Sequence, residues 1–201
     1  GVVRNALVIG VELISPYMDW SNRNVAVLFG DGCAAVVLQA SERREGLLGE
    51  HLGCYADARQ ILRVRGMGCT YANRGVQYGD TLWDFDGQEI FKKAVKGMAL
   101  ASEKVLAKCG VTAEQIYLVV PHQANLRIID HAVRKLGIPT ERVIVNVDRY
   151  GNTSSGSIPL ALGDAYDEGR LKDGELVLMT GVGAGLTWGS GLMEWTKEMA
   201  A

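Results

Sequence analysis

Short apolar runs alternate with helical patterns along most of this chain. Apolar residues recur with a period near 3.6 in residues 88–109, which predicts a helix there, and two further helices are predicted at residues 124–135 and 157–168. A glycine closes each segment, at positions 110, 137 and 169, as is common where a helix ends. Apolar and β-branched runs predict strands, the first of them buried, at residues 6–13, 47–55, 116–120, 142–147, 175–180 and 186–195.

Two segments give a weaker signal. Residues 25–39 are apolar but are interrupted by Gly-Asp-Gly at 30–32, which predicts either a β-hairpin or a bend in one long strand. Between residues 56 and 86 the periodicity fades, although apolar and aromatic side chains remain. Because exposing such side chains without a partner is unfavourable, we expect this stretch to lie over a pocket or an interface. The side chains concerned are Tyr71, Tyr78, Leu82, Trp83 and Phe85.

The order of the predicted elements favours an α/β protein. Two strands come first, and helices then alternate with strands, which is typical of a parallel sheet core that here ends in an antiparallel pair. In such sheets, ligands bind beyond the carboxyl ends of the strands. Three predicted turns lie at strand ends: one carries His122, one carries Asn152, and one is the glycine-rich segment 181–185. We therefore expect these turns to meet at one site.

The side chains of His122 and Asn152 can share one task. A neutral imidazole and an amide can both donate a hydrogen bond to a single oxygen, which stabilises an enolate or an oxyanion. Simpler interpretations stay open, because a lone histidine is often structural and Gly-Asn-Thr-Ser is a common turn and cap sequence. No convincing nucleophile accompanies the pair, since Cys33 lies in an apolar strand where buried packing is the better interpretation.

Composition excludes several classes of protein. The 201 residues are 48% hydrophobic and 22% charged with a net charge of -2, which indicates an ordinary soluble protein and not a nucleic-acid binder. No apolar run reaches about 18 residues, so no membrane span is expected. Without a signal peptide or a CxxC pair, we expect a cytoplasmic protein with reduced cysteines. The chain lacks an initial Met and soon enters a strand, so we expect a fragment of a longer protein.

Three further motifs give weaker indications of function. Segment 181–185 contains G-x-G, but it precedes a predicted strand and not a helix, so a dinucleotide site is rejected. His122 and His131 do not share one helix face, and no carboxylate pair completes a site with them, so no metal is expected. Lys92 and Lys96 share one face of the long helix, where they form either a solvated surface or a docking site for an acidic partner.

Four stretches together resemble one protein family. They read FGDGCAAV at residues 29–36, VPHQANLRI at 120–128, GNTSSGSIP at 151–159 and GAGLTWG at 183–189. In this order and spacing they resemble the β-ketoacyl-acyl-carrier-protein synthase III family of the thiolase-like fold, over nearly the whole chain. The resemblance implies an α/β fold: residues 46–201 would be the C-terminal thiolase-like domain, a mixed and mainly parallel sheet with helices on both faces. Residues 1–45 would be the terminal strands of the N-terminal half.

The resemblance also implies an activity. The family condenses an acyl-CoA primer with malonyl-acyl-carrier protein to give 3-oxoacyl-acyl-carrier protein, the first step of fatty-acid biosynthesis, with a Cys-His-Asn triad and no resident cofactor. His122 and Asn152 match the triad histidine and asparagine. The triad cysteine of the family precedes the region that matches Gly1. We therefore expect this chain alone to be inactive in full turnover.

Further positions match the family's substrate tunnel. Arg23 matches an arginine at the tunnel mouth, and Gly87 and Phe91 match positions along the CoA tunnel. Asn125 matches a position near the pantetheine arm. Ala184 stands where the family usually has glycine and where a backbone N–H helps to form the oxyanion hole. The N–H survives the change to alanine unless the position needs a positive φ.

The partners implied by the resemblance are acyl-CoA, acyl-carrier protein and a second copy in a homodimer. Arg127 matches the carrier-protein contact, to which Lys92 and Lys96 would add positive charge. Two alternatives stay open. The first is another acyl-CoA condensing enzyme of the same fold, such as a hydroxymethylglutaryl-CoA or alkylquinolone-type synthase. The second is a non-catalytic subunit that completes the pocket of an active partner.

Overall fold

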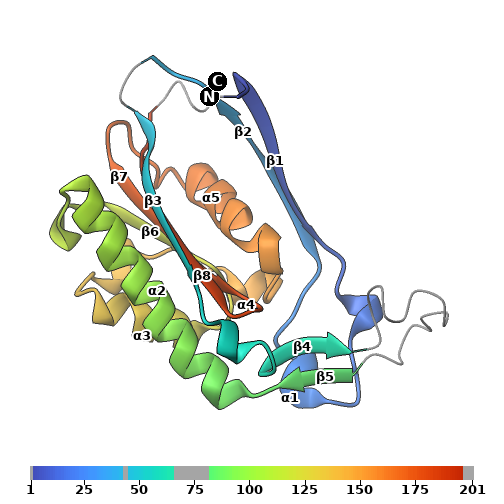
Figure 1. The fold of residues 1–201 in the computed structure, drawn as a ribbon. Coiled ribbons are helices and arrows are strands. Elements are labelled where there is room, and N and C mark those ends of the chain that lie inside the picture. Colours follow the sequence, from blue (N-terminus) through green and yellow to red (C-terminus); the bar gives the residue numbers. More distant parts are fainter. Residues whose placement is uncertain (1, 43–44, 66–81, 197–201) are drawn as a thin grey trace.

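A four-stranded mixed sheet forms the centre of the molecule in the computed structural model, which describes residues 2–42, 45–65 and 82–196. The strand order is β3-β8-β7-β6 (Figure 1). Only β6 and β7 run parallel, whereas β7–β8 and β8–β3 are antiparallel. The expected mixed α/β fold is present, but the expectation of a mainly parallel sheet is wrong for the described strands. The bounds are β3 Gly46–Cys54, β6 Leu118–Pro121, β7 Leu176–Gly183 and β8 Thr187–Glu194.

Helices cover both faces of this sheet, as expected. Helices α2 (Gly87–Cys109) and α3 (Leu126–Lys135) pack on one face, and α5 (Ser157–Asp167) packs on the other (Figure 1). The side chains of β6 alternate between the two layers: Val119 packs with α2 and α3, while Leu118 and Val120 pack with α5. Burial on both faces explains why this strand is a continuous apolar run in the sequence.

The helix ends follow the sequence signals closely. The Asp86 carboxylate accepts a hydrogen bond from the Glu89 N–H at 3.1 Å and caps α2 at its start. Gly110 ends the same helix with φ 70°, a left-handed conformation that favours glycine. Helix α3 begins two residues later than predicted, because the Asn125 side chain accepts from the Ile128 N–H at 2.9 Å and acts as the cap.

The strand predicted at residues 142–147 is wrong. The Ile144 N–H donates to the Val119 carbonyl at 3.0 Å, and the pairing with β6 is then limited to a single Val119–Val143 bridge. The Gln123 side chain bonds both the Ile144 carbonyl and the Asn146 N–H, so it takes the place of a neighbouring strand. A side chain thus ends the pairing, and the chain turns into the short helix α4 (Val147–Tyr150).

The hairpin predicted within residues 25–39 is also wrong. Helix α1 (Arg23–Ala26) occupies its first part, and β2 (Gly32–Gln39) pairs instead with β1 (Asn5–Glu12) as an antiparallel ribbon. Asp31 lies directly before β2, and its carboxylate accepts from the Ile14 and Ser15 N–H groups at 2.7 and 2.8 Å.

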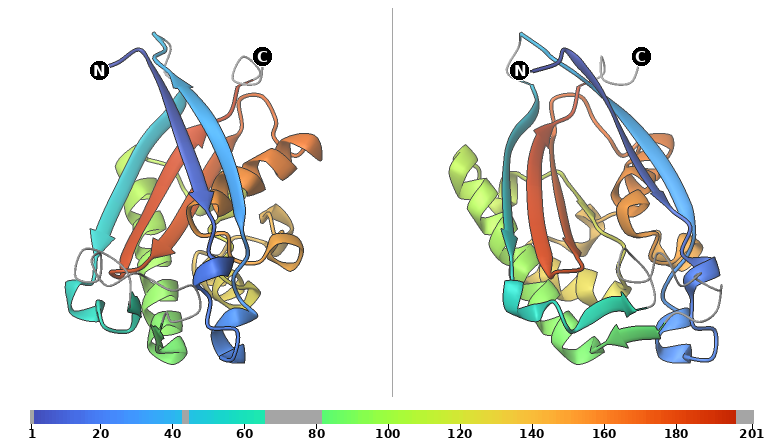
Figure 2. Two further views of the ribbon diagram at one scale, coloured as in Figure 1. Left: turned by 90° about the vertical axis from the view of Figure 1, so that its right-hand side faces the viewer. Right: turned by 45° about the vertical axis from the view of Figure 1, so that its right-hand side comes forward.

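The β1–β2 ribbon packs on α5 with one face, so that α5 lies between the sheet and the ribbon (Figures 1 and 2). Its other face carries Leu7, Ile9 and Val11, which are 62%, 58% and 63% exposed. The prediction of a buried strand at residues 6–13 is therefore correct for the strand and wrong for its burial in this chain. Cys33, on β2, is exposed as well, against the expected buried packing.

A second small ribbon and five short 3-10 helices complete the described structure. Strands β4 (Leu62–Arg65) and β5 (Leu82–Phe85) pair antiparallel near α1 (Figure 1). The 3-10 helices are Ser15–Tyr17, Ala56–Ala58, Ala113–Gln115, Thr140–Arg142 and Ser154–Gly156. Tyr71, Tyr78 and the side chain of Leu82, which were predicted to cover a pocket or an interface, lie outside the described part of the chain. None of the described helices is long and apolar enough to span a membrane.

Candidate active site

The three turns expected at one edge of the sheet line a single cavity of about 230 Å³. His122, Asn152 and Ala184 face it from different turns, and Asn125 adds a fourth position at the start of α3. Much of the remaining lining is apolar: Ile14, Leu28, Phe29, Leu62, Val64, Trp83, Phe85, Ile90, Ala124, Ile128, Val182 and Leu186. Trp83 and Phe85 confirm, for the part of segment 56–86 that the structure describes, that aromatic side chains there cover a pocket.

A wider pocket of about 1510 Å³ adjoins this cavity. Asn125 and Arg63 line both spaces. Gly87 and Phe91, which were expected along the CoA tunnel, line the wider one, as do Lys92 and Arg127, which were expected to contact the carrier protein. Arg23 and Lys96 line neither space. The structure therefore brings most of the sequence-predicted positions together around two connected spaces and leaves two of them on the surface.

His122 is held by its backbone and by one buried hydroxyl. Its N–H, directly after β6, donates to the Thr180 carbonyl of β7 at 2.7 Å. Its Nδ1 lies 2.5 Å from the Ser157 Oγ. Burial disfavours the charged ring and lowers the pKa of His122 from 6.5 to about 4. The imidazole is therefore neutral at pH 7. Among the described residues, its Nε2 has no hydrogen-bonding partner, and this residue lines the cavity.

Asn152 is fixed in a comparable way. Its N–H donates to the Leu28 carbonyl at 2.8 Å, and its carbonyl accepts from the Gly30 N–H at 3.1 Å. The side-chain Oδ1 accepts from the Ser154 N–H at 2.9 Å, which sets the orientation of the amide. Within the described residues the Nδ2 group has no protein partner. Each of the two side chains therefore has one polar atom occupied and one nitrogen left for the cavity.

Gln123 connects the histidine turn to the segment before Asn152. It is 1% exposed, and its Nε2 donates to the Pro121 and Ile144 carbonyls at 2.9 and 3.1 Å. Its Oε1 accepts from the Asn146 N–H at 3.0 Å. Three backbone groups from two chain segments are thus satisfied by one buried amide, which fixes the spacing of the two turns.

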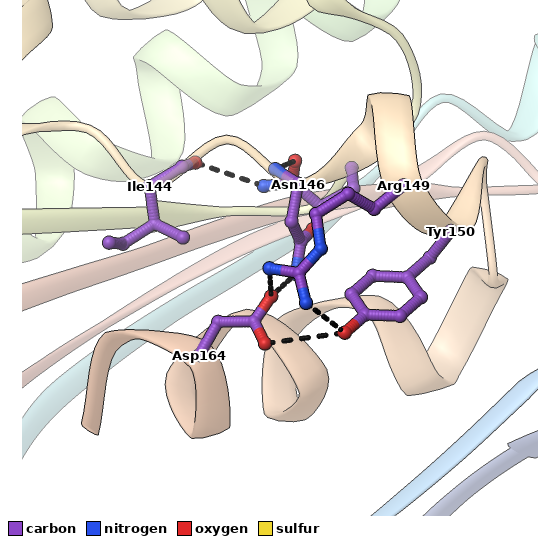
Figure 3. Close-up of polar contacts among 6 residues, drawn as sticks. Ile144, Asn146, Arg149, Tyr150 and Asp164 are labelled. Atoms are coloured by element: carbon purple, nitrogen blue, oxygen red, sulfur yellow. Dashed lines mark hydrogen bonds and ion pairs between the residues drawn. The ribbon is translucent and has the colours of Figure 1, made fainter. Parts of the chain in front are cut away.

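Asp164 holds the helix that leads into the asparagine turn (Figure 3). Its carboxylate accepts from the Asn146 Nδ2 at 2.7 Å, from the Arg149 guanidinium at 3.3 Å and from the Tyr150 hydroxyl at 3.4 Å. The Arg149 guanidinium also donates to the Tyr150 hydroxyl at 2.8 Å. This cluster ties α4 to α5 two residues before Asn152.

Ala184 keeps an ordinary backbone. Among the described residues other than glycine, only Ser154 has a positive φ, at 48°, so Ala184 is not in a conformation that demands glycine. The turn between β7 and β8 that carries Ala184 reaches the cavity. The Gly-to-Ala difference expected from the resemblance therefore introduces no backbone strain at this position.

The other sequence-predicted side chains lie in definite local settings. Asn125 caps α3, so its Oδ1 is already occupied. The Arg127 guanidinium stacks over the Phe91 ring at 6.0 Å. Lys92 forms an ion pair with Glu89 at 2.8 Å, which raises the pKa of Lys92 through the hydrogen bond and the charge of Glu89. Asn125, Arg127 and Lys92 all line the wider pocket.

No cysteine of the described chain lines the cavity of His122 and Asn152. Within the same residues, no group of three His, Cys, Asp or Glu side chains is placed to hold a metal ion. Sequence reasoning missed the side chains that support the site, namely Ser157, Gln123, Asn146, Asp164 and Arg63. Gln123 and Ser157 lie inside the quoted motifs, and their polar character at positions next to apolar elements was the available signal.

Comparison with known proteins fits this architecture. The fold is thiolase-like: the structure superimposes on 3-oxoacyl-(acyl carrier protein) synthase III from Pseudomonas aeruginosa PAO1 with a TM-score of 0.88 and 37% identity, covering 98% of this chain and 60% of that one. The same synthase from Aquifex aeolicus VF5 gives a TM-score of 0.85 and 43% identity, covering 96% and 58%.

Sequence comparison defines the family. The models for 3-oxoacyl-[acyl-carrier-protein] synthase III match residues 1–56 and, for its C-terminal part, residues 106–195. A β-ketoacyl-[acyl-carrier-protein] synthase III 2 of Vibrio cholerae is 46% identical over 98% of this chain. The chain belongs to the β-ketoacyl-acyl-carrier-protein synthase III family. It spans little more than half the length of the curated relatives that it matches, 54% in the Vibrio cholerae protein.

Proposed function

We propose that this chain forms the part of a condensing enzyme that stabilises an enolate. The complete reaction would be the decarboxylative Claisen condensation of an acyl-CoA primer with malonyl-acyl-carrier protein, which starts fatty-acid biosynthesis. One observation carries the proposal: His122 and Asn152 line the same cavity, and each keeps one nitrogen without a partner among the described residues. The names of the relatives support the choice of substrates.

The chemistry follows from these two donors. When malonyl thioester loses CO₂, the electron pair of the broken C–C bond moves into the thioester and places negative charge on its oxygen. His122 and Asn152 each donate a hydrogen bond to that oxygen. The Ala184 N–H donates to the oxyanion that forms when the enolate attacks the primer thioester. The enolate carbon then attacks the primer thioester, and the sulfur that carried the primer leaves as a thiolate. The substrates are CoA and phosphopantetheine thioesters, and no resident cofactor is required.

The nucleophilic cysteine would come from the part of the relatives that this chain does not match. The described cysteines lie away from the cavity, which supports this assignment. The domain division proposed from the sequence agrees with it: residues 1–45 would belong to the N-terminal half, and the exposed apolar face of the β1–β2 ribbon would pack within that half or against a second copy in a homodimer. This chain alone would then carry out decarboxylation without condensation.

The wider pocket would receive the CoA and carrier arms. Its lining includes Gly87, Phe91 and Asn125, together with Arg127 and Lys92. Arg23 and Lys96 are exposed outside it, where they would meet the phosphates of CoA and the acidic carrier protein. We place the protein in the cytoplasm, where these substrates occur.

The test measures two activities of the 201-residue chain separately. Release of labelled CO₂ from malonyl thioester should be slow but measurable, and His122→Ala or Asn152→Ala should each lower it by about 10²–10³-fold, as for the loss of one oxyanion donor. His51→Ala is the matched control, because His51 lines neither pocket. Incubation with labelled acyl-CoA should leave no thioester on the chain. Stable labelling of Cys33 or another cysteine of this chain, or decarboxylation that survives both active-site changes, contradicts the proposal.

A further inference from the structure

We infer that Ser157 is a positioning residue that fixes the tautomer of His122, so that the proton of the neutral ring lies on Nε2. For its use in the reaction, this inference rests on the proposed function. The contact itself is direct, with the Ser157 Oγ 2.5 Å from the His122 Nδ1. Ser157 is the first residue of α5 and is 2% exposed, so water does not compete for its hydroxyl.

The direction of the hydrogen bond follows from the other neighbour of the hydroxyl. The Gln123 N–H points at the Ser157 Oγ at 3.4 Å, and a backbone N–H can only donate. The Oγ therefore accepts from the Gln123 N–H, and its own hydroxyl hydrogen still needs an acceptor. Among the described residues, the only acceptor in hydrogen-bonding contact with this hydroxyl is the His122 Nδ1. The hydroxyl donates to Nδ1, and the ring proton is left on Nε2.

The opposite arrangement is unfavourable. If Nδ1 carried the proton and donated to Ser157, the buried hydroxyl would receive two donors and its own proton would have no acceptor within the described structure. An unsatisfied buried hydroxyl proton is a rare and costly state. The Nε2 would then face the cavity as a lone pair and would repel an enolate oxygen instead of stabilising it.

The residues around His122 restrict movement of its ring away from Ser157. The backbone of His122 is tied to Thr180, and a Cβ on Gly181 would come within 3.4 Å of the His122 Cβ, so the ring packs closely on β7. Ser157 follows the Asn152 turn by five residues. One short segment thus supplies one proposed donor directly and sets the protonation of the other. In a neutral histidine, the hydrogen bond made by one ring nitrogen decides which nitrogen carries the proton.

Nuclear magnetic resonance of the whole chain with ¹⁵N-labelled histidine tests the tautomer without any substrate. The signals of His122 are those absent from His122→Gln. At neutral pH they should report a protonated Nε2 and an unprotonated Nδ1. Ser157→Ala should produce a mixture of tautomers, and Ser157→Thr, which keeps the hydroxyl, should restore the original signals. Ser102→Ala is the control, because Ser102 is an equally buried hydroxyl that bonds Ser190 and not a histidine.

Kinetics of malonyl thioester decarboxylation test the consequence. Ser157→Ala should lower kcat by about tenfold, less than the loss of a whole donor because part of the population keeps its Nε2 proton. KM should stay within about twofold, since Ser157 touches no substrate in this assignment. A proton on Nδ1 in the unchanged chain, or a Ser157→Ala variant with an unchanged tautomer or kcat, overturns the inference. Failure of the unchanged chain to decarboxylate malonyl thioester would refute the proposed function. The tautomer of His122 would then still be tested by the nuclear magnetic resonance experiment, which needs no substrate.

Discussion

Replacing Gln123 by leucine should destabilise the chain far more than replacing a polar side chain that satisfies no buried backbone groups. The change keeps a similar volume but removes the partner of three backbone groups, the Pro121 and Ile144 carbonyls and the Asn146 N–H. Each buried group left without a partner costs about 1–3 kcal/mol, and carbonyls are the cheaper kind. We expect the free energy of unfolding to fall by about 3–6 kcal/mol in total.

That loss is a large share of the stability of a typical domain, which is about 5–15 kcal/mol. Urea unfolding followed by circular dichroism measures it. Gln39→Leu, at an exposed strand end, is the control and should change little. A decrease below about 1 kcal/mol for Gln123→Leu would refute the reasoning, because the three backbone groups would then have found other partners.

Three further outcomes are expected. The free energy of unfolding, measured by urea unfolding at each pH, should decrease as the pH falls from about 6.5 towards 4, because the unfolded chain binds a proton at His122 that the folded chain does not bind. Gly30→Ala should lower both the melting temperature and the decarboxylation rate, because its Cβ would lie 2.1 Å from the Tyr150 carbonyl oxygen, two residues before Asn152. Gly163→Ala, whose Cβ would have nothing within 4 Å, should leave the decarboxylation rate unchanged. Arg127→Glu should raise KM for malonyl-acyl-carrier protein by about tenfold and leave malonyl-CoA nearly unaffected, with Lys104→Glu as the charge-matched control; equal effects on both substrates would contradict carrier docking.

Local patterns predicted the elements that depend on local physics. The helix at 88–109 was recognised from its period and its Asp86 cap, and the structure places its ends within a residue. The segments at 25–39 and 142–147 failed for a different reason. Their backbone groups bond to parts of the chain that are distant in sequence, to Asn152 in the first case and to the Gln123 side chain in the second. No local pattern shows such a partner.

The candidate site divides in the same way. His122 was found because a polar residue directly after a strand is visible in the sequence. Asn152 was found from its Gly-Asn-Thr-Ser turn, although the strand expected before that turn is absent, and the structure brings both residues to one cavity. Ser157 and Asp164 were not found, because each lies on a helix whose inward face becomes known only after α5 has packed on the sheet. The groups that face the cavity were predictable, and the groups that orient them required the fold.

The β1–β2 ribbon has a consequence for the slow motions of the chain. A two-stranded ribbon is marginally stable by itself, so its amide protons should exchange with solvent through local opening, much faster than those of β6, β7 and β8. The segment that leads into β2 also carries the two backbone bonds that hold Asn152, through Leu28 and Gly30. We therefore expect opening of the ribbon to loosen the asparagine turn as well. Any binding partner that clamps the ribbon would slow exchange at both places and, by the same coupling, keep the amide aimed at the cavity.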